Sequence, residues 1–117
     1  MFPALPELKV FLAIEVTDMR KAINGLSILV AEHLELDPFA GHLFAFCNRK
    51  RDIVKILYWD RNGFCLWQKR LEKDRFRWPD SADDVLSIGG RELSWLIEGL
   101  SLDQQCAHQR QSYTTVI

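Results

Sequence analysis

The sequence of 117 residues contains no apolar run near the roughly 20 residues that a membrane-spanning helix requires. Its first residues also lack the basic start of a signal peptide, so we expect a cytoplasmic protein with no membrane partner. Internal repeats and low-complexity tracts are absent as well. An apolar share of 48% and a charged share of 26% exclude a disordered chain, and the length fits one folded domain.

Cysteine and histidine are scarce and scattered. They occur at Cys47, Cys65 and Cys106 and at His33, His42 and His108. An odd number of cysteines without a C-x-x-C pair argues against a disulfide framework, and the histidines do not form a ligand set with the cysteines. We therefore expect free thiols, no metal and no cofactor.

Motifs of common enzyme classes are also missing. The chain has neither a Walker A or G-x-G-x-x-G phosphate loop nor a G-x-S-x-G nucleophile motif. Asp18, Asp37 and Asp60 could form a carboxylate triad for two-metal phosphoryl transfer. Each has a plainer role, however, as a helix cap, a residue before proline or a turn residue. We expect a protein that is not an enzyme, with a metal-dependent enzyme as a rival interpretation.

Charge is unevenly distributed along the chain, although the net charge is only −1. Between residues 49 and 77 there are ten Lys and Arg against four Asp and Glu, whereas the rest of the chain has five against twelve. The ten basic residues are Arg49, Lys50, Arg51, Lys55, Arg61, Lys69, Arg70, Lys73, Arg75 and Arg77. Such a segment, interleaved with aromatic residues, is typical of a nucleic-acid surface, so we predict that these ten residues contact DNA.

Plainer interpretations exist for the same residues. The charges could merely solvate the outer face of a small sheet, and Trp59, Trp67 and Trp78 could belong to the core instead of stacking on bases. Lys55 is unusual because it lies within an apolar stretch, where a lysine must pair its charge or extend its ammonium group to water. It could meet a phosphate or a partner carboxylate, or it could lie at the edge of the core with its ammonium group in solvent.

The first half of the chain predicts a strand followed by a helix. Residues 8–16 are rich in β-branched and aromatic residues, which favours a strand. Apolar residues then recur at helical spacing, which predicts a helix over 19–36 with Asp18 as its N-cap. Pro38 disfavours helical geometry at the residue before it, so the helix should end there.

Three strands are predicted next, over 42–48, 53–60 and 64–71, with a shorter piece over 76–78. Asn62-Gly63 is a strong hairpin signal, and pairing through this turn would place Trp59 opposite Leu66 and Tyr58 opposite Trp67. Alternation assigns one face to Phe44, Phe46, Leu57, Trp59, Phe64 and Leu66, and the other to Ala45, Cys47, Val54, Ile56, Tyr58, Cys65 and Trp67. Because neither face is polar, we expect helices on one face and a partner, tail or ligand on the other.

A second helix is predicted over 91–98, with Gly99 as its C-cap, and residues 103–117 show no periodic pattern. The predicted fold is a single α+β domain in the order β-α-β-β-β-α. Its three middle strands form an antiparallel meander, and its two helices pack on one face.

Several ordered blocks of the sequence resemble a known family. They are Asp18-Met19-Arg20-Lys21 with Gly25-Leu26, Asp37-Pro38-Phe39 with Gly41-His42-Leu43-Phe44, Lys55-Ile56-Leu57-Tyr58-Trp59-Asp60 with Gly63-Phe64-Cys65-Leu66-Trp67, Lys69-Arg70-Leu71-Glu72, Arg75-Phe76, Trp78-Pro79 and Leu93 through Gly99. Together they resemble the small accessory proteins, called TnpB, that are encoded beside the transposase in insertion sequences of the IS66 type.

This resemblance implies a bacterial protein that assists transposition without cutting DNA, and it assigns no catalytic residue. It covers residues 8–100 as one accessory domain, with 101–117 as an irregular tail. The implied partners are DNA and the transposase of the same element, and a homo-oligomer is compatible with the apolar sheet. The alternative function is a protein-interaction module that docks to the transposase, or to a second copy, without contacting DNA.

Overall fold

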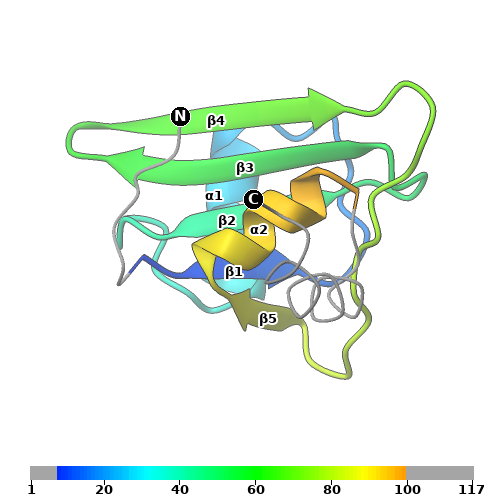
Figure 1. The fold of residues 1–117 in the computed structure, drawn as a ribbon. Coiled ribbons are helices and arrows are strands. Elements are labelled where there is room, and N and C mark those ends of the chain that lie inside the picture. Colours follow the sequence, from blue (N-terminus) through cyan, green and yellow to red (C-terminus); the bar gives the residue numbers. More distant parts are fainter. Residues whose placement is uncertain (1–7, 100–117) are drawn as a thin grey trace, which may run out of the picture.

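The protein is built around a mixed sheet of five strands in the order β4-β3-β2-β1-β5 (Figure 1). The structure is a computed structural model and describes residues 8–99. The strands are β1 (Val10–Ala13), β2 (Leu43–Cys47), β3 (Ile53–Asp60), β4 (Gly63–Arg70) and β5 (Val85–Ile88). β1 and β2 run parallel, and all other neighbours pair antiparallel. The α+β class is therefore confirmed, and the expected order of elements lacked β5.

Two helical layers cover the sheet, one on each face. The first consists of α1 (Ile23–Ile28), which continues into a π-helical turn, η1 (Leu29–His33), and the second is α2 (Gly90–Ile97). Figure 1 shows α1 behind the sheet and α2 in front of it. The prediction that both helices pack on one face was wrong. Because both faces of the sheet are apolar, each needs its own cover, and α2 provides the second one.

Each helix belongs to its own hydrophobic cluster. On one face, Leu26 and Val30 pack with Phe44, Phe46 and Leu57. On the other face, the helix α2 packs with a second set of buried residues, which includes Val10, Leu12, Ala45, Ile56, Phe76, Leu93 and Leu96. These clusters confirm the assignment of strand residues to the two faces except for Trp59 and Cys65, which belong to neither cluster.

The first helix begins later than its apolar pattern indicates. It starts at Ile23, with Ala22 as its N-cap, and not at residue 19. The Asp18 carboxylate accepts hydrogen bonds from the main-chain N–H and the guanidinium of Arg20, so it forms a local turn in place of a helix cap. The helical segment ends at His33, and Glu35 follows with a positive φ of 55°.

The hairpin between β3 and β4 also differs from its prediction. Asp60 pairs with Gly63, so Arg61 and Asn62 form the turn, and Arg61 takes a φ of 57°. Trp59 therefore lies opposite Phe64 and not opposite Leu66. A shift of two residues leaves every side chain on its predicted face, because the side-chain period of a strand is two.

Two further predictions concern the second half of the chain. Residues 76–78 do not form a strand, although Phe76 and Trp78 are buried. The irregular tail over 101–117 and Cys106 lie outside the described residues. Over residues 8–99, none of the helices has the length and apolar character needed to cross a membrane.

Candidate nucleic-acid interface

The turn between β2 and β3 presents the most concentrated group of cations, and Asn48 holds its shape. The Asn48 side-chain oxygen accepts hydrogen bonds from the main-chain N–H groups of Asp52 and Ile53, each at 3.0 Å, and its amide nitrogen donates to the Asp52 carboxylate at 2.7 Å. Arg51 completes the turn with a φ of 62°. Arg49 and Lys50 are consequently exposed at a well-defined tip.

The segment that follows β4 lies beside this turn. The main-chain N–H of Leu71 donates to the Asp52 carbonyl oxygen at 2.8 Å, and that of Phe76 donates to the Arg51 carbonyl oxygen at 2.6 Å. These two bonds, together with the burial of the Phe76 side chain, place residues 70–77 against the turn. Two basic segments that are about twenty positions apart in the sequence thus meet at one end of the sheet.

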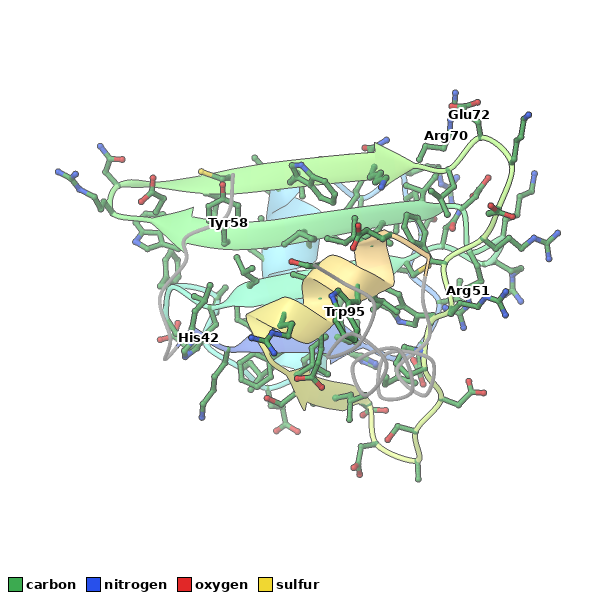
Figure 2. The ribbon with its side chains drawn as sticks, in the orientation of Figure 1. His42, Arg51, Tyr58, Arg70, Glu72 and Trp95 are labelled. Carbon is green, nitrogen blue, oxygen red and sulfur yellow. The ribbon has the colours of Figure 1, made fainter. Side chains whose placement is uncertain are left out.

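We name this region the basic end and define it by its seven cations, Arg49, Lys50, Arg51, Arg70, Lys73, Arg75 and Arg77. All except Arg51 are exposed. Figure 2 shows Arg51 and Arg70 at this end of the molecule, and Tyr58 toward the other end. The same segments carry three carboxylates, Asp52, Glu72 and Asp74, so the cations are in clear excess. The Arg70–Glu72 ion pair, at 3.4 Å, is exposed and therefore weak.

A cavity of about 680 Å³ opens beside the turn. Arg49, Lys50 and Arg70 line it, together with Asn48 and Asp52. Ile53 and residues 16–19, which include Asp18, form the remainder of its wall. Cations that converge on a hollow from two segments can surround a phosphate group without any contact to a base, which is how proteins hold a nucleic-acid backbone.

The other three predicted residues lie elsewhere. Arg61 is exposed in the β3–β4 turn, at the opposite end of β3. Lys69 faces α2, where its ammonium group donates to the Ile97 carbonyl oxygen at 3.1 Å. A cation at a helix C-terminus offsets the negative end of the helix dipole, so Lys69 has a structural role.

Lys55 follows neither interpretation that its sequence position left open. Only 9% of the residue is exposed, and its ammonium group donates to the carbonyl oxygens of Met19 and Lys21, at 2.9 and 3.0 Å. It therefore joins the middle of β3 to the chain that precedes α1. Because both acceptors are main-chain atoms, which every residue has, the sequence could not predict this contact.

Arg51 also contributes beneath the surface. It is half-buried, and its guanidinium lies close to the thiol of Cys47, which is completely buried. Burial raises the pKa of the Cys47 thiol, and the Arg51 guanidinium partly opposes that rise. Arg51 is therefore directed partly toward the core, which the basic pattern alone did not indicate.

The three tryptophans of the basic segment differ in exposure. Trp78 is buried, and its indole N–H donates to the Ala13 carbonyl oxygen at 2.9 Å. Trp59 is half-buried and lies edge-on to Phe39 and Phe64, with ring centroids 5.0 Å apart in both pairs. Trp78 is therefore a core residue, and no tryptophan is fully exposed for base stacking.

Comparisons with known proteins identify relatives of this chain. The chain is 36% identical over 100 residues to the uncharacterized protein y4hO of Sinorhizobium fredii (strain NBRC 101917 / NGR234), an alignment that covers 86% of this chain and 87% of that protein. It is likewise 36% identical over 93 residues to the uncharacterized protein y4jC of the same organism, with 80% of each chain covered. No solved structure matches.

A family model with the description "IS66 Orf2 like protein" matches residues 8–107, which include the whole described domain. The resemblance carried by the sequence blocks is thereby confirmed. The chain belongs to the IS66 Orf2-like (TnpB) family of insertion-sequence accessory proteins.

Proposed function

We propose that this protein is a non-catalytic DNA-binding factor, which assists transposition in the bacterial cytoplasm by holding DNA at the basic end. The six exposed cations of that end, Arg49, Lys50, Arg70, Lys73, Arg75 and Arg77, would contact phosphates and position the duplex beside the transposase. Sequence readout would be slight, because arginine and lysine on phosphate carry no base information.

One observation carries this proposal: the two main-chain hydrogen bonds that join residues 71 and 76 to the β2–β3 turn. They bring two basic segments onto one surface, where a single duplex can meet both. We leave Lys55 and Lys69 out of the contact set, because their ammonium groups already bind main-chain carbonyl oxygens. Arg61 is left out because it lies at the other end of β3.

The test is fluorescence anisotropy of a labelled duplex, with an element-end sequence and a scrambled one, from about 50 to 300 mM salt. Six phosphate contacts predict that log affinity falls with log salt at a slope of about −5, since each contact contributes roughly −0.9. Similar affinities for the two duplexes would match backbone recognition, and a preference for element ends would add sequence readout.

A pair of double variants locates the surface. Arg49→Glu/Lys50→Glu reverses two cations at the basic end and should abolish most of the binding. Arg61→Glu/Arg91→Glu makes the same change in net charge at two exposed positions outside the basic end, and should leave most of the affinity in place. Equal losses in the two variants would mean that only net charge matters. Absence of binding at low salt would favour the interaction module that docks to the transposase.

A further inference from the structure

Three side chains that could ligate a metal ion converge beside α1, outside the basic end. They are Glu15, just after β1, His33, at the end of η1, and Asp84, just before β5. One potential ligand atom from each residue lies within 4.8 Å of the other two. The His33 imidazole Nε2 and a Glu15 carboxylate oxygen are 3.4 Å apart. Asp18, Asp37 and Asp60, the triad considered from the sequence, do not belong to this group.

The backbone positions these side chains from three separate elements. The Ile14 N–H donates to the Asp84 carbonyl oxygen at 3.0 Å, which holds the start of β5 against the end of β1. His33 lies in the last turn of η1, which closes with a bond from the Leu34 N–H to the Leu29 carbonyl oxygen at 3.0 Å. The ligands are thus carried by hydrogen-bonded backbone, although their own side chains are exposed.

Carboxylates outnumber cations around the group, because Glu15, Glu32 and Asp84 line the adjoining cavity together with one lysine, Lys21. Glu15 and Asp84 place two carboxylates close together, and neither is in an ion pair with a lysine or arginine of residues 8–99. Two like charges at such a distance repel each other, and a divalent ion between them removes that repulsion. Glu32, one residue before His33, adds a third carboxylate to the wall of the adjoining cavity.

That cavity, of about 450 Å³, leaves room for the rest of a coordination sphere. Thr17, Lys21 and Glu32 also line it. A tetrahedral zinc ion with ligands at about 2.0–2.1 Å needs its donor atoms roughly 3.3 Å apart, a separation that Glu15 and His33 already have. The exposed Asp84 carboxylate has an oxygen within 4.8 Å of both of these donor atoms.

We propose that Glu15, His33 and Asp84 bind a divalent transition-metal ion, with water from the cavity in the remaining coordination position. One imidazole and two carboxylates suit Zn²⁺ and Mn²⁺, and the nitrogen ligand disfavours Mg²⁺. The ion joins η1 to the β1–β5 edge of the sheet and stabilises their packing. This inference goes beyond DNA binding and does not depend on it.

The first experiment is isothermal titration calorimetry of the full chain with Zn²⁺, Mn²⁺ or Mg²⁺ alone. We expect one equivalent of Zn²⁺ to bind more tightly than Mn²⁺, in line with the usual affinity order, and Mg²⁺ to bind much more weakly. His33→Ala and Glu15→Gln should each lower the Zn²⁺ affinity roughly tenfold or more. Glu32→Gln is the matched control, because it removes a carboxylate from the same cavity without removing a ligand.

A second measurement uses the unaltered chain, so its result does not depend on whether the variants fold. Mn²⁺ broadens nearby NMR signals, so amide signals of residues 15, 33 and 84 should fade before all others. Zn²⁺ binding that survives both ligand variants would overturn the proposal. So would an equal loss in Glu32→Gln, which would indicate general attraction to a negative cavity, or a Zn²⁺ site that disappears on substitution of the cysteines.

Discussion

The Trp78 indole N–H donates to the Ala13 carbonyl oxygen at 2.9 Å, across 65 positions of the sequence. Both residues are buried, so this bond satisfies two polar groups inside an apolar environment. It attaches the segment after β4 to the end of β1, after that segment has passed the basic end. The position of Arg75 and Arg77 on the surface therefore depends on an anchor in the core.

Replacing Trp78 by Phe should destabilise the fold by about 1–3 kcal/mol, beyond the effect of the lost ring volume, because the Ala13 carbonyl oxygen is left buried without its donor. Urea unfolding followed by circular dichroism gives this difference. Trp59→Phe is the matched control, since the Trp59 indole makes no hydrogen bond within residues 8–99. Similar losses in the two variants would show that ring volume, and not the hydrogen bond, determines the effect.

Lys55→Met separates a structural lysine from a phosphate contact. Methionine keeps most of the apolar stem but leaves the carbonyl oxygens of Met19 and Lys21 without their donor. We expect a loss of about 1–3 kcal/mol in the free energy of unfolding and little change in DNA affinity at a temperature where the variant is folded. Unchanged stability together with weaker DNA binding would return Lys55 to the contact set.

The carboxyl group of Asp18 should titrate far below its usual range. Hydrogen bonds from the Arg20 side chain and main chain lower the pKa of Asp18 from 3.8 to about 2. Because the folded value is the lower one, any stabilisation by this contact is complete above pH 3.8 and fades as the pH falls toward 2. Carboxyl carbon NMR shifts measure the titration directly.

Arg20→Gln provides the control for that titration. It removes the larger of the two hydrogen-bond effects and should move the Asp18 pKa part of the way back toward 3.8. A value that stays near 2 in the variant would mean that the main-chain bond dominates.

Cys47 should react with alkylating agents more slowly than Cys65 in the folded protein. Cys47 is completely buried, and burial raises the pKa of its thiol, whereas Cys65 is only half-buried. Only the thiolate is the nucleophile, so both access and ionisation protect Cys47. Mass spectrometry after timed treatment with iodoacetamide gives the two rates, and denaturation in urea should make them similar.

Local pattern was enough to predict much of this domain. The alternation of apolar residues over 42–71 identified three strands and the correct face for most of their side chains. The C-cap of α2 is Glu98, one residue before the predicted Gly99, which follows with a φ of 96°. The predicted partner of Trp59 was wrong by two residues, yet the faces were still correct, because strand periodicity depends only on the backbone. The resemblance to the accessory family likewise followed from ordered blocks of sequence.

The sequence marks ten basic residues as predicted DNA contacts, but it does not reveal how the fold separates them into groups. Lys55 and Lys69 are as basic as Arg49, yet both bind main-chain carbonyl oxygens that no residue pattern reveals. Asn48, which shapes the turn, is an ordinary polar residue in the sequence. Only the contacts seen in the structure distinguish these structural roles from exposure on the surface.

The sequence by itself therefore determined four of the five strands, most of their apolar faces, the basic segment and the family. Only the tertiary structure decided that β5 pairs with β1, that α1 and α2 cover opposite faces, and that the β2–β3 turn meets residues 70–77. The physical reason is distance along the chain. The apolar pattern that specifies a strand or a helix repeats every few residues, so it can be read locally. The pairing of Ile14 with Asp84, in contrast, depends on the summed burial of the whole domain.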